Sequence, residues 1–384
     1  MKNKTVNVAK SLNRQSAPIH GSHETFIKRI IANEFRETPS SELLSPTFTV
    51  PPIFIRDGHG GIIHGESKKP DRTFHLFSPN YDPKIDASSG SSEDRIGIVK
   101  SLFSRVSAPL GYNEVPEAFN PDDAYALLNK EFPWFEEANH IAVSWLASSR
   151  RNRHFHLPNI ALDGKPGIGK TRWARRVASM INPVAGKTDD TVGVVSLAGM
   201  SSVLNIIGCD QSYVGSKPGL WYEVIARSQS ANPIIILDEI DKAEENVAHA
   251  LLSFLAPETS SKFFCPFFRT EVNLSKVNYV ATTNDFRAMP EPLQSRLEII
   301  HCRVPTLEEV KDLIPTLASE IMREIGETVP FSPDMNLIAN AYHEDQNIRT
   351  VRSEVSRQIR EIFWKASSRP RHTPHAPHRI GFTR

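Results

Sequence analysis

A glycine-rich stretch of eight residues constrains the fold of this chain more than any other feature. It matches the pattern G-x-x-x-x-G-K-[ST] at every fixed position and reads Gly164, Lys165, Pro166, Gly167, Ile168, Gly169, Lys170, Thr171. Glycines let such a loop bend so that backbone N–H groups converge on phosphates, Lys170 supplies charge to the β- and γ-oxygens, and the Thr171 hydroxyl ligates Mg²⁺. The stretch therefore predicts a site for a nucleoside triphosphate.

The sequence on either side of this loop supports the prediction. Residues 159–162 are typical of a short buried strand, and residues 172–180 carry apolar side chains at helical spacing. A strand, a loop and a helix in this order aim the N-terminus of the helix at an anion. The alternative, a surface turn rich in glycine and proline, is disfavoured because both the motif and its context fit.

The composition is that of an ordinary soluble chain. Its 384 residues are 39% hydrophobic and 23% charged, which suits two or three domains. The net charge of +1 gives no global argument for a nucleic-acid or membrane partner, so such an argument rests on the basic ends of the chain. We find no apolar run near the ~20 residues that a membrane helix needs, and the polar N-terminus is unlike a signal peptide.

The three cysteines, Cys209, Cys265 and Cys302, are isolated from one another in the sequence. An odd number without C-x-x-C spacing argues against both a disulfide framework and a zinc site. The pattern favours a reducing cytosol.

The two ends of the chain differ from its middle. Residues 1–95 are rich in Ser, Pro, Gly and His and are predicted to be partly disordered, with a helix at 24–35 and short extended pieces at 47–55 and 72–77. The basic excess in the first thirty residues suits nucleic acid, but a solvated arm is the favoured interpretation. Residues 367–384 carry four arginines and no acids and are predicted to be a disordered basic tail, whose prolines disfavour metal binding by its histidines.

A second strong signal lies at residues 231–240, where four aliphatic residues are followed by Asp238 and Glu239. This is typical of a central parallel strand whose carboxyl end delivers acidic groups to a site. Asp238 is assigned to the Mg²⁺ shell, and Glu239 to the orientation and polarisation of the attacking water. The alternative for Asp238, capping of a helix after a buried strand, loses weight beside an upstream phosphate loop.

The segment 237–242 resembles the acidic motif of the AAA+ ATPases and, within them, of the Lon protease family. Similar motifs follow in the family's order: a pore-loop region at 211–219, the helix after the acidic strand at 248–257, a sensor-1 strand at 280–284, an arginine-finger segment at 295–300 and a sensor-2 element at 347–349. The resemblance covers about residues 120–365. It does not extend to the Ser/Lys proteolytic domain or to the N-domain of Lon.

This resemblance implies an α/β fold of the P-loop NTPase (AAA+) class, with a three-layer parallel sheet followed by a small all-helical lid. We expect the large ATPase subdomain with its leading helices at 96–304 and the lid at 305–366. The sequence also predicts individual helices. Pro121 begins one helix, and residues 134–147 form an amphipathic stretch. Thr306 begins a capping box ahead of the first lid helix. Further lid helices are predicted at 333–343 and 349–364.

The resemblance also implies roles for single residues. Asn284 would hydrogen-bond the lytic water or the γ-phosphate, Arg296 would reach the γ-phosphate of a neighbouring subunit, and Arg349 would approach the nucleotide from the lid. Tyr213 and Val214 would grip a substrate in a central pore. The alternatives are a turn-forming asparagine, surface arginines and a tyrosine packed on its own domain.

Two function classes remain open at this stage. The first is a cytoplasmic ATPase that uses ATP and Mg²⁺, forms a homo-oligomeric ring, by resemblance a hexamer, and remodels or threads a protein substrate. No protease activity is expected from this chain, so a separate protease is a candidate partner. The second is a nucleic-acid-associated ATPase or assembly switch that uses the basic termini. The aromatic–aliphatic–glycine triplet at 213–215 favours the first, because a ring grips varied side chains at low entropic cost.

Overall fold

The computed structural model describes residues 55–56, 62–63, 73–83, 93–152, 154–184 and 186–367. The chain divides into two compact units, residues 1–68 and 69–384, which we treat separately. In the first unit, β1 (Ile55–Arg56) pairs antiparallel with β2 (Ile62–Ile63). The predicted helix at 24–35, the basic residues before it and nearly all of the basic tail lie outside the described residues.

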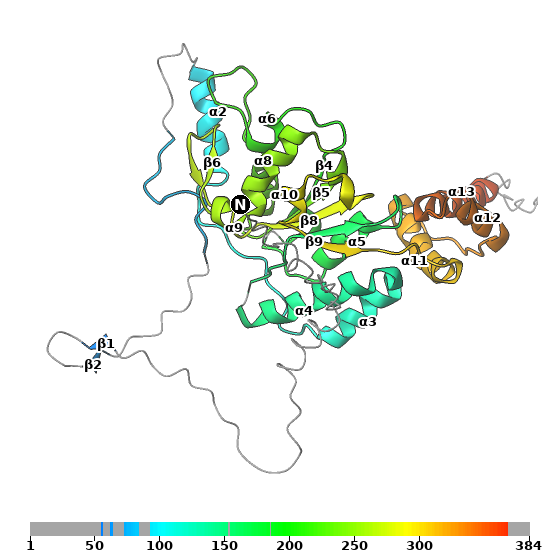
Figure 1. Cartoon of the computed structure of the whole chain (residues 1–384). Helices are drawn as coiled ribbons and strands as arrows, with labels where there is room; N and C mark the ends of the chain where they lie inside the picture. The colour runs from blue at the N-terminus through cyan, green and yellow to red at the C-terminus, as the bar shows by residue number, and fades with distance from the viewer. Residues whose placement is uncertain are drawn as a thin grey trace, which may run out of the picture. The chain divides into compact units, whose positions relative to one another are not determined.

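The second unit is built around a five-stranded parallel sheet with the order β4-β5-β8-β3-β9 (Figure 1). The strands are β3 (Ile160–Asp163), β4 (Val192–Ser196), β5 (Ile234–Asp238), β8 (Asn278–Thr283) and β9 (Glu298–His301). The predicted strand after the phosphate loop and the predicted central acidic strand are both confirmed as β4 and β5. Strand β8 pairs directly with β5, as expected for the strand that precedes Asn284.

Alternate residues of the strands enter two separate hydrophobic cores. Ile234 and Ile236 of β5 contribute to one core, and Ile235 and Leu237 to the other. Because successive side chains of a strand point to opposite faces, the sheet must be covered on both sides. This arrangement confirms the predicted three-layer α/β class.

Helices cover each face of the sheet. The first core takes side chains from α3 (Pro121–Glu131), α4 (Glu136–Asn152) and α5 (Lys170–Ala178). The second takes them from α2 (Glu93–Ser104), α6 (Leu204–Ile207), α7 (Leu220–Ser228) and α8 (Glu245–Leu255). The remaining short helices are η2 (Pro133–Phe135), η3 (Thr188–Thr191), η4 (Ile240–Lys242), α9 (Pro257–Ser260), η5 (Phe286–Ala288) and α10 (Glu291–Gln294).

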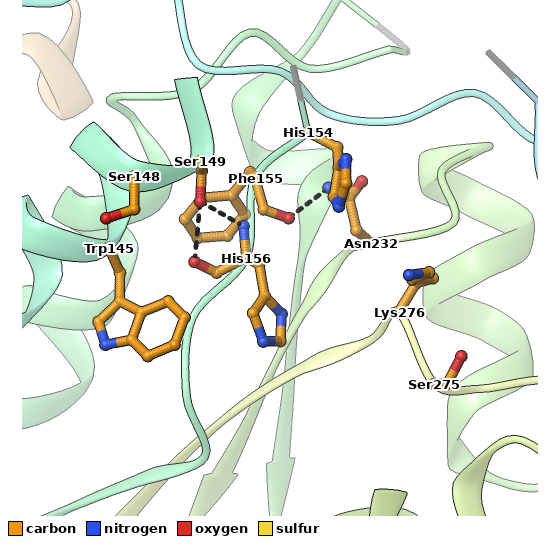
Figure 2. Close-up of a pocket in the computed structure, with 9 residues that line it drawn as sticks. All are labelled: Trp145, Ser148, Ser149, His154, Phe155, His156, Asn232, Ser275 and Lys276. Carbon is orange, nitrogen blue, oxygen red and sulfur yellow. Dashed lines mark hydrogen bonds between the residues drawn. The ribbon is translucent and has the colours of Figure 1, made fainter. Parts of the chain in front are cut away.

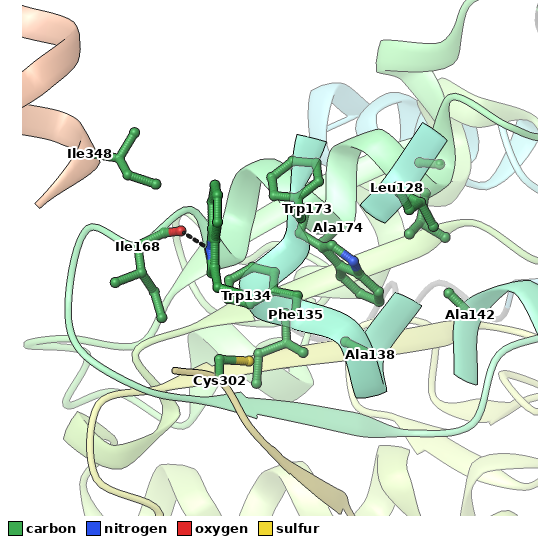
Figure 3. Packing of buried hydrophobic residues seen from close by; sticks show 14 of the residues in the cluster. Leu128, Trp134, Phe135, Ala138, Ala142, Ile168, Trp173, Ala174, Cys302 and Ile348 are labelled. Atoms are coloured by element: carbon green, nitrogen blue, oxygen red, sulfur yellow. Dashed lines mark hydrogen bonds between the residues drawn. The ribbon is translucent and has the colours of Figure 1, made fainter. Parts of the chain in front are cut away.

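The helix predicted at 134–147 begins later than expected. Pro133–Phe135 form a 3₁₀ turn, and α4 starts at Glu136. The turn buries Trp134 and Phe135 against the phosphate loop, and the Trp134 indole N–H donates to the Ile168 carbonyl at 2.9 Å (Figure 3). The leading helices therefore support the loop from one side.

Several elements of this unit have no counterpart among the sequence-based predictions, among them helices α2 and α7, a hairpin and an edge strand. An antiparallel hairpin, β6 (Phe263–Cys265) and β7 (Thr270–Val272), lies between α9 and β8. Strand β9 at the sheet edge begins within the segment that was interpreted only as bearing the arginine finger. Residues 73–83, which the sequence groups with the N-terminal region, also contribute to this unit, since Phe74 bridges to Leu110 and Leu76 is buried.

The C-terminal part of the unit is helical, as predicted. It comprises α11 (Leu307–Ile325), α12 (Met335–Asp345) and α13 (Ile348–Ser367). The capping box is confirmed, because the Thr306 hydroxyl accepts from the Glu309 N–H while the Glu309 carboxylate accepts from the Thr306 N–H. Within the described part of the chain, every helix is too short or too polar to cross a bilayer.

Candidate nucleotide site

The phosphate loop, residues 164–171, connects β3 to α5, as the motif requires. Gly167 and Gly169 have φ values of +78° and +99°, which are the left-handed conformations that glycine adopts without strain. Ile168 between them is fully buried and anchors the loop in the core. The loop thus curves in front of the N-terminus of α5, where backbone N–H groups favour an anion.

Lys170 lies in the centre of this curve and is only 7% exposed. Its ammonium group donates to the carbonyl oxygens of Gly164 and Lys165 at 2.6 and 3.0 Å and to Asn284 Oδ1 at 3.0 Å. Burial lowers its pKa from the usual lysine value, and nearby carboxylates such as Asp163 and Asp238 oppose this effect. The structure therefore brings together two residues that the sequence places 114 positions apart.

Asp238 is the hub of a hydroxyl and carboxylate cluster at the end of β5. Its Oδ1 accepts from the Thr282 hydroxyl at 2.6 Å and from the Thr171 hydroxyl at 3.1 Å. Glu239 follows in a left-handed conformation, with φ of 56°, and its N–H donates to the Thr282 hydroxyl at 3.0 Å. Thr282 therefore orients both acidic residues.

This cluster fits a magnesium site. Mg²⁺ prefers oxygen ligands and takes one or two carboxylates together with phosphate oxygens and water. Thr171 and Asp238 offer a hydroxyl and a carboxylate in direct contact. In the described ranges no group of three or more His, Cys, Asp or Glu side chains could hold a metal by itself.

The lid helix α13 contacts the phosphate loop directly. The Ile348 N–H donates to the Gly167 carbonyl at 3.1 Å, and the Lys165 ammonium donates to Gln346 Oε1 at 2.9 Å. The Asn347 side chain lies over Gly167, where a Cβ atom would approach its Oδ1 to 1.9 Å. Arg349 follows Ile348 in the first turn of α13, which places its backbone near the loop. Its side chain is exposed.

Arg296 lies at the amino ends of the strands, whereas the phosphate loop lies at their carboxyl ends. It precedes β9, whose first residue pairs with the first residue of β3, whereas the loop follows the last residue of β3. A four-residue strand spans roughly 13 Å. The structure therefore does not bring Arg296 to the site of its own chain, and its side chain is exposed.

The predicted gripping residues lie in a different connection of the chain from the phosphate loop. Tyr213 and Val214 are 65% and 93% exposed in the connection between α6 and α7. The alternative in which Tyr213 packs on its own domain is therefore wrong in this structure. Large apolar side chains exposed side by side in the chain suit contact with another molecule.

A separate cavity of about 220 Å³ opens at the amino ends of the same strands (Figure 2). His156, Asn232 and Lys276, which line it, precede β3, β5 and β8 respectively. Burial, followed by the charges of Lys276 and His154, lowers the pKa of His156. None of the predicted site residues lines this cavity, so it is distinct from the nucleotide site.

Sequence reasoning did not identify the roles of Thr282, Trp134 and Gln346. Thr282 had a weak signal, because it is a polar residue inside a buried strand. Trp134 and Gln346 act through contacts with loop residues more than thirty and more than one hundred positions away. Nothing in local spacing indicates such partners.

Comparison with known proteins identifies the domain that carries this site. Residues 160–303 match the family model described as "ATPase family associated with various cellular activities (AAA)". Among curated proteins, Lon protease 2 of Borreliella burgdorferi is 30% identical over 285 residues, which are 70% of this chain and 35% of that protein. Lon protease of Bacillus thuringiensis is 27% identical over 323 residues, which are 80% of this chain and 39% of that protein. The chain thus spans little more than a third of the length of these relatives.

Solved structures support the fold. A closed state of Hsp104 with ATPγS and FITC casein superposes with a TM-score of 0.54 at 14% identity, covering 66% of this chain and 50% of that chain. The extended S. cerevisiae Hsp104–casein complex gives a TM-score of 0.53 at 15% identity. At such identity the likeness concerns the fold alone.

The contact between Gly167 and Asn347 yields a prediction about nucleotide binding. Replacing Gly167 with Ala places a methyl group against Asn347 and imposes a left-handed conformation on a residue that disfavours it by about 1–2 kcal/mol. We expect the affinity for ADP, measured by calorimetry, to fall by about tenfold or more.

Two further variants isolate the steric contribution. Gly199 has a similar φ of +70° with nothing near its missing Cβ, so Gly199→Ala should leave ADP affinity unchanged. The Gly167→Ala/Asn347→Gly double variant should bind ADP better than Gly167→Ala alone. A double variant as weak as the single one would show that the Asn347 contact is unimportant.

Proposed function

We propose, from the premise that this chain contains an AAA domain within a Lon-like AAA+ module, that it is an ATP-hydrolysing ring ATPase that remodels or threads a protein substrate. The observation that carries the proposal is the convergence of Lys170, Asn284, Thr171 and Asp238 through hydrogen bonds at one sheet edge. A lysine, a hydroxyl, a carboxylate and an amide grouped in this way suit the binding and positioning of a triphosphate.

The chemistry follows from the positions of the side chains. Lys170 neutralises the β- and γ-oxygens, which replace its present carbonyl acceptors. Thr171 and Asp238 hold Mg²⁺, which supplies charge neutralisation at the phosphates when bound. Glu239 orients and deprotonates the attacking water, and Asn284 donates from its amide to that water or to the γ-phosphate while its Oδ1 accepts from Lys170.

The division of labour between Lys170 and Glu239 can be tested with two substitutions. Lys170→Ala should abolish ATP binding because the loop loses the buried cation at its centre. Glu239→Gln should keep binding and reduce turnover by ~10²–10⁴ because only the base is lost. Equilibrium binding and steady-state phosphate release separate these effects. Glu244→Gln, an exposed neighbour, is the control. Parental turnover in Glu239→Gln would remove Glu239 from the mechanism.

The position of Arg296 supports assembly into a ring. This arginine lies at the sheet edge remote from its own phosphate loop, so its proposed contact with a γ-phosphate requires a neighbouring subunit. A hexamer is proposed from the resemblance to Lon, and Arg349 is proposed to approach the same nucleotide from the lid.

Subunit mixing tests the proposed role of Arg296. Arg296→Ala should lower ATP turnover by ~10³ or more without removing nucleotide binding. Arg296→Ala and Lys170→Ala subunits, each inactive alone, should regain activity when mixed, because some interfaces pair an intact loop with an intact arginine. An active monomer in light scattering would contradict ring assembly.

The exposure of Tyr213 and Val214 favours a protein substrate over nucleic acid. A neutral aromatic–aliphatic pair offers apolar contact area to varied side chains, whereas a site for nucleic acid needs positive charge along its length. The alternative of a nucleic-acid-associated ATPase rests on the basic termini, which lie outside the described residues. The cytoplasmic location and a separate partner protease remain part of this proposal.

Tyr213→Ala distinguishes the two function classes. ATP hydrolysis without a client should continue because Tyr213 is remote from the phosphate site. Unfolding of a client protein should fall tenfold or more, since losing a buried aromatic contact costs roughly 1.5–3 kcal/mol and each ~1.4 kcal/mol is tenfold. If client processing is unchanged while deletion of residues 1–30 or 367–384 abolishes salt-dependent DNA binding, the nucleic-acid alternative replaces this proposal.

A further inference from the structure

The loop that carries Tyr213 and Val214, residues 208–219, is closed at its base. Gly208 and Pro218 form an antiparallel bridge, and the Cys209 N–H donates to the Lys217 carbonyl at 3.0 Å. We call this segment the Tyr213 loop. Its two apolar residues project beyond this base and are among the most exposed large hydrophobic residues of the described chain.

Asp210 connects the Tyr213 loop to the β6–β7 hairpin. The Arg269 guanidinium binds its carboxylate in a bidentate manner, with Nε–Oδ2 and Nη2–Oδ1 distances of 2.9 Å each. On the loop side, Asp210 Oδ1 accepts from the N–H and hydroxyl of Ser212, and the Asp210 carbonyl accepts from the Tyr213 N–H. Arg269, foremost, holds the pKa of Asp210 well below its usual range, so the pair stays ionised at neutral pH.

The hairpin end of this connection is firmly held. Arg269 has a left-handed φ of 53°, which is uncommon for a residue with a side chain. The two preceding residues, Phe267 and Phe268, are 1% exposed, and the Tyr81 hydroxyl donates to the Phe268 carbonyl. A strained backbone conformation that the surroundings enforce is a common sign of a functional position.

The hairpin is followed in the chain by β8, whose carboxyl end contributes to the candidate nucleotide site. After β7 the chain continues through Leu274, whose N–H donates to the Ser260 carbonyl, and enters β8. Strand β8 carries Thr282, which hydrogen-bonds Asp238, and is followed by Asn284. Arg269 therefore lies at the start of the hairpin strand β7, which precedes β8 in the chain.

We propose that Arg269 and Asp210 are positioning residues that hold the Tyr213 loop in a defined geometry relative to β8, so that the apolar tip is presented to an extended, unfolded polypeptide. This inference rests on the proposed remodelling function. Both side chains are 31% exposed, and ion pairs with such exposure contribute little to global stability. The bidentate geometry and the enforced conformation of Arg269 thus serve the local geometry of the loop.

The test uses the full-length chain and α-casein, an unfolded probe protein. Asp210→Asn keeps the size of the side chain and an acceptor for Ser212 but removes the charge. We expect the apparent KM for casein in casein-stimulated ATP hydrolysis to rise about three- to tenfold, with the maximal stimulated rate retained, because the loop is less ordered but its contact residues remain. Arg269→Gln should act alike, and the double variant should be no worse than either single one.

Matched variants separate positioning from stability. Asp210→Glu should restore much of the affinity for casein, and Lys262→Gln, an exposed cation near β6, should change nothing. High salt should raise the KM of the parent more than that of Asp210→Asn. A parental KM in Asp210→Asn overturns the proposal, as does a melting temperature lowered in proportion to the loss of casein affinity.

The design keeps this inference separable from the proposed function. If Tyr213→Ala leaves the KM for casein unchanged, the proposed function itself fails. If Tyr213→Ala raises that KM while Asp210→Asn and Arg269→Gln do not, only the positioning role fails.

Discussion

The parallel register of β5, β8 and β3 is the constraint on which the rest of this structure depends. Ile236 is opposite Val280, which in turn is opposite Ile160, so the three strands end at the same edge. The chain leaves the sheet there at Asp238, Asn284 and the phosphate loop. Their side chains are therefore close enough to form hydrogen bonds with one another. The same register places Arg296 at the amino ends of the strands, away from the phosphate loop of its own chain.

Alternation along the strands explains why this edge is rigid. Because Ile235 and Leu237 enter one core and Ile234 and Ile236 the other, shifting β5 by one residue would exchange its side chains between two differently shaped cores. Among the buried polar residues of β8, Thr282 is satisfied by Asp238 and the Glu239 N–H. A buried hydroxyl with two partners of this kind fixes the acidic residues more narrowly than the backbone alone.

The sequence predicted what depends on local pattern. The glycines of the loop, the aliphatic run before Asp238 and the Thr306 capping box each carry their structure within a few residues, and the fold class was implied by the resemblance to the AAA+ ATPases. The β6–β7 hairpin and β9 were not predicted, because short strands at an edge or in an insertion lack strong periodicity. The lid contact of Asn347 on Gly167 and the Trp134–Ile168 hydrogen bond depend on tertiary packing, which spacing does not encode.

Two hydrogen bonds restrain the carbonyl groups of the phosphate loop. Trp134 holds the Ile168 carbonyl from the side of the leading helices, while Ile348 holds the Gly167 carbonyl from the lid. The carbonyls of adjacent residues are thus fixed by different parts of the chain. A displacement of α13 that keeps the Ile348–Gly167 hydrogen bond acts on Gly167 next to the anchor at Ile168. Because the N–H groups of such a loop favour an anion, the lid contact and the proposed nucleotide site share the same short segment of backbone.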